Sequence, residues 1–204
     1  MSNLFGKLKD LNLATKLNLI FGALALVCTL AVIGGQVIYN RVKIGGPTYS
    51  AIERDMGTID DIAKLRVNLF YVRAALLTLL IDRDPAVRQE QQQQIKDLSS
   101  RIDELFDTVK TGLEAAEKRE VLANLAKARE AWNAFRETRD SRLIPLILEN
   151  RLGEAMAIAK GVQAERYALF VAETKEAVEL LRKDLPARTE AIGKEADLLQ
   201  RMFI

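Results

Sequence analysis

The chain has 204 residues, a formal net charge of +2, no histidine and a single cysteine, Cys28, which excludes the usual zinc and haem sites and an intrachain disulfide framework. Basic and acidic residues are interleaved, so the sequence offers no basic patch for a nucleic acid, and we expect no nucleic-acid partner. The abundance of Ala, Leu, Glu, Lys, Gln and Arg, with only four prolines, predicts an all-α protein.

The first 40 residues have the pattern of a membrane anchor. Residues 1–16 form a short polar leader, and residues 17–40 contain no charged side chain. As a helix this run would be about 36 Å long, enough to cross a hydrocarbon core of roughly 30 Å. We therefore predict a transmembrane helix over residues 17–40. A buried core helix and a cleaved signal peptide are the alternatives.

The orientation of this predicted span is not decided by charge, because Lys and Arg residues flank it almost equally on both sides. Long domains cross a membrane with little regard to charge. We expect a cytoplasmic leader, with the rest of the chain outside the bacterial inner membrane, in the periplasm or the extracellular space.

The stretch from residue 52 to 81 predicts a helix with two apolar faces. The first face is an unbroken series at three- and four-residue steps, typical of the side that a helix buries in its own bundle. Its members are Ile62, Leu65, Leu69, Val72, Leu76 and Leu79. A second series lies about 100° around the helix. Its members are Ile52, Met56, Ile59, Ala63, Arg66, Phe70, Arg73, Leu77 and Leu80. One bundle cannot cover both faces, so we expect the second face to pack against another copy of the chain.

Two guanidinium groups interrupt the second face. Arg66 and Arg73 lie seven residues apart where the other members are apolar. A guanidinium at such a position requires an anion, a carboxylate or water.

Three further helices are predicted after this one, over residues 85–112, 117–149 and from 153 towards the end of the chain. Pro145 should kink the third helix or loosen its last turn, and Pro186 should kink the fourth. Four long helices with short joints predict an up-down-up-down antiparallel four-helix bundle. We assign residues 41–199 to this domain. Residues 200–204 turn apolar, so we expect a second span to begin there and a cytoplasmic signalling module to follow Ile204.

This order of parts resembles the front half of a bacterial methyl-accepting chemotaxis protein with a four-helix-bundle sensor domain. The resemblance covers nearly the whole chain. It is carried by Thr15-Lys16-Leu17 entering the span, by the run from Ile62 to Arg73, and by the segment from Trp132 to Ala159. In that segment Trp132, Phe135 and Arg136 precede a turn, and Glu154-Ala155 opens the final helix. Sensor bundles of membrane histidine kinases and cyclase-type signalling proteins are similar, so these stay open as alternatives.

The resemblance implies a homodimer in which the first bundle helices of two subunits meet. It also implies ligand capture at that seam and a displacement of the last helix as the signal. In the amino-acid receptors of this family, arginines on the first helix hold the ligand carboxylate. The seven-residue spacing of Arg66 and Arg73 departs from that pattern, so amino-acid specificity is not transferred.

The candidate ligand site follows from matching levels on antiparallel helices. If the first and last bundle helices meet the membrane near residues 40 and 200, the residue numbers of two positions at the same height add up to about 240. This sets Arg73 level with Tyr167 and Arg66 level with Thr174, with Phe70, Arg166 and Phe170 beside them. We predict that these seven residues bind a small, anionic ligand. The alternative is that both arginines pair with carboxylates across the interface, or extend to its rim, and bind nothing.

An enzyme is not expected. The sequence has no histidine base, no cysteine outside the apolar run, no Gly-rich phosphate loop and no recurrent inward carboxylate pair. We predict no cofactor and no metal. The competing interpretation is a purely structural, membrane-anchored helical dimer.

Overall fold

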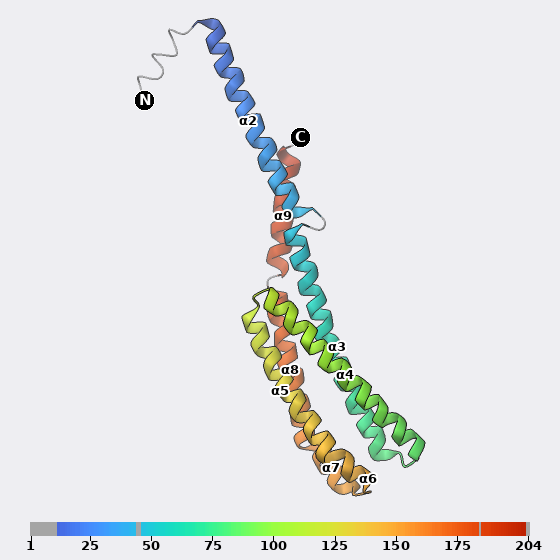
Figure 1. The fold of residues 1–204 in the computed structure, drawn as a ribbon. Helices are drawn as coiled ribbons and strands as arrows, with labels where there is room; N and C mark the ends of the chain where they lie inside the picture. The colour runs from blue at the N-terminus through green and yellow to red at the C-terminus, as the bar shows by residue number, and fades with distance from the viewer. Residues whose placement is uncertain (1–11, 44–45, 184, 203–204) are drawn as a thin grey trace. The chain divides into compact units, whose positions relative to one another are not determined.

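The computed structural model describes residues 12–43, 46–183 and 185–202, which are helical over nearly their whole length (Figure 1). No strand occurs in these ranges. Contacts divide the chain into two compact units, residues 52–186 and residues 1–51 with 187–204. The all-α prediction is confirmed.

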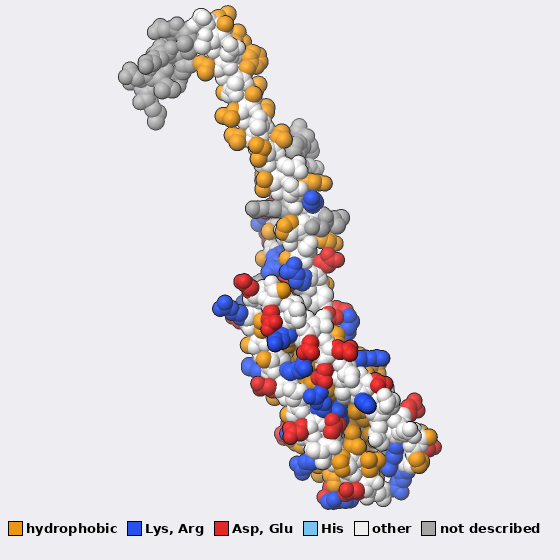
Figure 2. All heavy atoms as spheres, viewed as in Figure 1, with side chains coloured by type: hydrophobic (Ala, Val, Ile, Leu, Met, Phe, Trp, Pro, Cys, Tyr) orange, Lys and Arg blue, Asp and Glu red, His pale blue; other side chains and the backbone are white. Residues whose placement is uncertain are grey.

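The unit that contains the N-terminal region is dominated by α2, Leu13–Val42. Asn12 caps this helix, because its side-chain oxygen accepts hydrogen bonds from the Thr15 backbone N–H at 2.8 Å and the Thr15 hydroxyl at 2.6 Å. Residues 13–40 have a mean hydropathy of 2.3 and bury none of their most apolar window. Figure 2 shows hydrophobic side chains along α2. The helix is long and apolar enough to cross a membrane, and it begins four residues before the predicted span.

The same unit includes most of α9, Leu185–Met202. The predicted start of a second span falls on the last turn of this helix up to residue 202. Residues 203–204 lie outside the described residues, as do residues 1–11 of the predicted leader.

The larger unit is a four-helix bundle, as predicted. Its first two legs are α3, Pro47–Ile81, and α4, Pro85–Ala115. The third leg consists of α5, Arg119–Thr138, a π-helical turn η1, Arg139–Leu143, and α6, Ile144–Leu148. The fourth consists of α7, Leu152–Lys160, and α8, Val162–Lys183.

The structure confirms that the first predicted face of α3 is buried in the bundle core. All six members of that series are at most 3% exposed. The facing helices contribute four fully buried aromatic rings, of which Phe106 meets Phe170 edge-on and Trp132 stacks on Phe135. On α4, Phe106 enters the core, whereas the neighbouring Leu105 is only partly buried.

Both long later legs are interrupted. In the third leg the backbone widens to the π-helical turn immediately before Pro145, where a proline cannot donate the regular bond and crowds the preceding turn. This agrees with the predicted loosening. In the fourth leg the helix breaks at Gly161, with φ −89° and ψ −110°, a break that the sequence did not predict. The predicted single helix from residue 153 is therefore α7, α8 and α9.

Candidate functional site

The second face of α3 remains largely open in a single chain. Ile59 and Leu80 turn into the bundle core, at 8% and 5% exposure. The other apolar members Met56, Phe70 and Leu77 are exposed, and Val67, Tyr71 and Ile81 extend the same apolar surface. The bundle therefore leaves one side of α3 uncovered, as the two-face pattern predicts.

Arg66 and Arg73 lie on this face with partial exposure. The Arg73 guanidinium lies over the ring of Tyr167 on α8, with 4.6 Å between Cζ and the ring centroid. This contact places Arg73 and Tyr167 at one level, as the antiparallel register predicts. Among the residues that the structure describes, neither guanidinium has a hydrogen bond or an ion pair.

The surrounding stretch of α3 offers these guanidiniums no counter-charge. Residues 66–81 contain no carboxylate. Their only ionisable side chains are those of Arg66, Tyr71 and Arg73. The nearest basic neighbour behaves differently, because Lys64 Nζ contacts Asp60 at 2.7 Å and Asp61 at 2.8 Å. Hydrogen bonds to these carboxylates raise the pKa of the Lys64 ammonium. The two arginines are thus the unneutralised charges of this face.

Phe70 belongs to the same cluster. It is 57% exposed and meets the ring of Tyr71 edge-on, with 5.7 Å between centroids. On a helix, positions 66, 70 and 73 are neighbours at steps of four and three residues. The structure therefore brings together four of the seven predicted ligand-binding residues: Arg66, Phe70, Arg73 and Tyr167.

The other three predicted residues face the bundle interior. The Arg166 guanidinium donates hydrogen bonds to the Ala134 carbonyl and the Thr138 hydroxyl of α5. Phe170 and Thr174 have no exposed surface. The Thr174 hydroxyl donates to the Phe170 carbonyl at 2.8 Å, and among the described residues no hydrogen bond joins it to Arg66.

The reason is that Phe170 and Thr174 belong to the face of α8 that is buried in the bundle core. The buried positions of α8 follow steps of seven, four, three, one and three residues. They are Gln163, Phe170, Thr174, Ala177, Val178 and Leu181. Phe170 therefore fills the core against Phe106 and does not stand as a wall beside the arginines.

A set of partly and fully buried polar contacts between helices was not predicted. The Asp103 carboxylate on α4 accepts from Trp132 Nε1 at 2.9 Å and from Arg136 Nη1 at 2.5 Å on α5. Arg139, only 3% exposed, donates to the Ser99 hydroxyl at 2.8 Å. An aspartate directly after the core residue Ile102 was the available signal.

A second buried contact joins α8 to α5. Gln163 is 3% exposed, and its Nε2 donates to the Phe135 carbonyl at 3.0 Å. With Arg166 it ties the start of α8 to the end of α5. These contacts serve the packing of the bundle.

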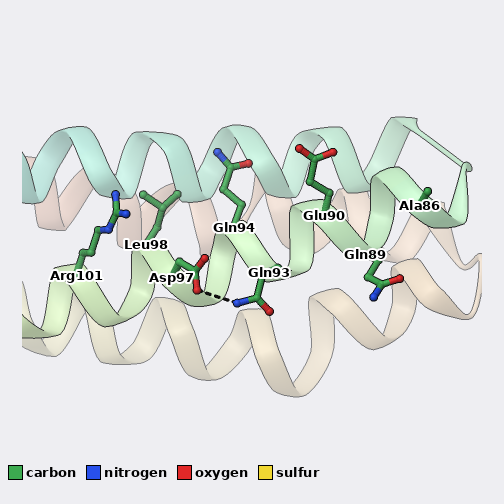
Figure 3. A pocket seen from close by; sticks show the side chains of 8 residues that line it. All are labelled: Ala86, Gln89, Glu90, Gln93, Gln94, Asp97, Leu98 and Arg101. Carbon is green, nitrogen blue, oxygen red and sulfur yellow. Dashed lines mark hydrogen bonds between the residues drawn. The ribbon is translucent and has the colours of Figure 1, made fainter.

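One surface groove lies on α4 and is an unpromising site. Its volume is about 690 Å³, and all eight lining residues, Ala86 to Arg101, come from this one helix (Figure 3). In Figure 3 the lining side chains point to both sides of α4, and Gln93 donates to Asp97 at 2.8 Å. The groups do not converge on one point. In the described ranges, no three His, Cys, Asp or Glu side chains are grouped so that they could hold a metal ion.

The comparison with known proteins bears on the bundle as a whole. No curated protein and no solved structure matches the chain. A family model does match: the four helix bundle sensory module for signal transduction covers residues 10–184 of the 204. This family consists of sensor modules and is not an enzyme family. Because the match includes α2 and all four legs of the bundle, the chain belongs to the family of four-helix-bundle sensory modules for signal transduction.

Proposed function

We propose that the chain is the extracytoplasmic sensor region of a bacterial transmembrane chemoreceptor. In this proposal α2 anchors it in the inner membrane, two copies pair through α3, and a small anion binds at Arg66 and Arg73. The same sensor on a membrane histidine kinase or a cyclase-type protein is the alternative, and it differs only in the output module.

The unneutralised guanidiniums on the open face of α3 carry this proposal. In a two-fold symmetric dimer each copy presents the same surface to the other. A second α3 would therefore bring two more arginines and, over residues 66–81, no carboxylate. Covering charged groups without a partner is costly, whereas a small anion would neutralise them through the fork-shaped guanidinium.

Signalling would follow from a shift between two packings of the last helix. A ligand changes such an equilibrium only by binding one packing more tightly than the other. The Arg73–Tyr167 contact joins the proposed anion site to α8. An anion that draws the Arg73 guanidinium away from the Tyr167 ring would change the packing of α8 against α3, and α9 follows α8 along the chain.

The test is thermal unfolding of the detergent-solubilised chain with a panel of small organic anions. We expect at least one anion to raise the midpoint, because it binds only the folded state. Arg66→Ala and Arg73→Ala should each remove most of this shift. Light scattering on the same samples should give twice the mass of one chain.

Lys64→Ala is the matched control. It removes one positive charge two residues from Arg66, but its ammonium is already paired with Asp60 and Asp61. It should leave the anion shift intact. If no anion stabilises the chain and the dimer persists, the purely structural dimer is the better account.

A further inference from the structure

The aromatic residues of the bundle divide into two groups. Residues 52–186 contain seven, and four of them are fully buried in the core: Phe106, Trp132, Phe135 and Phe170. The remaining three, Phe70, Tyr71 and Tyr167, reach solvent. All three lie in the cluster that holds the two arginines.

The geometry of the cluster alternates cation and ring. Along one side of α3 the order is Arg66, Phe70, Arg73, and Arg73 in turn covers the Tyr167 ring at 4.6 Å. Seven residues of helix separate the Cα atoms of the two arginines by about 10.5 Å along the axis, and Phe70 lies between them in sequence. A bound molecule that contacts an arginine therefore also meets an aromatic surface.

The same stretch argues against a zwitterionic amino acid. The ammonium group of an amino acid needs carboxylate or carbonyl acceptors. Residues 66–81 offer no carboxylate, and the backbone carbonyls of residues 66–77, beside the two arginines, accept the hydrogen bonds of the helix. The cluster can bind a negative charge and a flat apolar body, but on α3 it lacks a partner for a positive charge.

We infer that the ligand of this site is an aromatic carboxylate, whose carboxylate pairs with Arg66 or Arg73 and whose ring packs on Phe70 and Tyr71. This inference rests on the proposed function and specifies its ligand class. Carboxylate and guanidinium match as a two-point contact. The ring adds offset or edge-to-face packing with the exposed aromatics, together with the attraction between a guanidinium and a π face.

The experiment compares benzoate with cyclohexanecarboxylate on the full chain by isothermal titration calorimetry. The two probes carry the same charge and similar apolar volume, and they differ in aromaticity. We expect benzoate to bind roughly three- to tenfold more tightly, the size of an aromatic-pair contribution. Phe70→Leu should bring the two affinities within about twofold by weakening benzoate alone.

Tyr49→Leu is the control, since Tyr49 is another exposed aromatic on α3, well before the cluster in sequence. It should leave the benzoate preference unchanged. Equal binding of the two probes, with dependence on Arg73 retained, would overturn the aromatic class while the anion sensor stands. Binding of neither probe, when an aliphatic anion does bind, would also overturn it. If no anion of any kind binds, the proposed function falls together with this inference.

Discussion

At the scale of single residues, Asp103 is a carboxylate that joins α4 to α5. It accepts from the fully buried Trp132 and from the half-buried Arg136. Asp103→Ala leaves the indole N–H without its acceptor, so the free energy of unfolding should fall by about 1–3 kcal/mol. Asp103→Asn keeps an acceptor for Trp132 and loses the charge opposite Arg136 and Arg129, so its loss should be smaller, about 0.5–1 kcal/mol.

Denaturant unfolding followed by circular dichroism measures these differences. Asp97→Ala is the matched change on the same helix, because Asp97 is exposed and bonds only to Gln93. It should change stability by less than about 0.5 kcal/mol. Equal losses for the alanine and asparagine variants of Asp103 would show that Trp132 does not depend on this oxygen.

Residue by residue, the candidate site was only partly predictable. Arg66 and Arg73 stood out because a charge inside an apolar series is conspicuous, and their location on the open face of α3 follows from helix periodicity alone. The burial of Phe170 and Thr174 could not be predicted, because the core face of α8 also includes the polar residue Gln163. A glutamine that bonds to a neighbouring carbonyl can be buried, and hydrophobic periodicity cannot detect that.

At the scale of elements, the long legs were predictable and their interruptions only partly so. Pro145 predicted an irregularity in the third leg, because proline lacks the N–H of a regular helix, and the structure accommodates it with a π-helical turn. Gly161 did not predict a helix break, because a single glycine inside a helical pattern is often tolerated. The break there depends on a backbone conformation that only the packed structure reveals.

Two glycines of the fourth leg should therefore respond to alanine with opposite signs. At Gly161 an added Cβ would lie 3.0 Å from the Ala157 carbonyl oxygen, a backbone atom that also accepts the Gly161 N–H. Gly161→Ala should lower the free energy of unfolding by about 1–2 kcal/mol. At Gly153, in α7, nothing lies within 4 Å of the added Cβ. Gly153→Ala should stabilise by about 0.5 kcal/mol.

Thermal and denaturant melts of the two variants, measured side by side, decide between this account and a flexible joint. A joint that simply bends would tolerate the Gly161→Ala change with a gain in helix propensity, and both variants would then be stabilised.

At the scale of the whole molecule, the chain combines an apolar helix with a bundle whose surface mixes both signs of charge (Figure 2). The composition of each part suits a different environment. A run of uncharged, apolar residues is stable as a helix in hydrocarbon, whereas a surface with interleaved charges is stable in water. This division was the most predictable property of the chain, since it depends on composition over tens of residues and not on any single contact.

The sole cysteine, Cys28, allows the membrane topology of the chain to be measured by thiol labelling. It lies near the middle of α2, so in intact cells a membrane-impermeant maleimide should not reach it, and denaturation in SDS should expose it. In a Cys28→Ala background, Ser141→Cys places a thiol at an exposed position of η1, which the reagent should label from outside. Ser2→Cys, in the predicted leader, should be labelled only after permeabilisation. The opposite pattern for these two positions would reverse the proposed orientation.

A mature chain whose mass lacks Cys28 would identify α2 as a cleaved signal sequence, and the bundle would then have to reach the membrane by another route or leave it altogether.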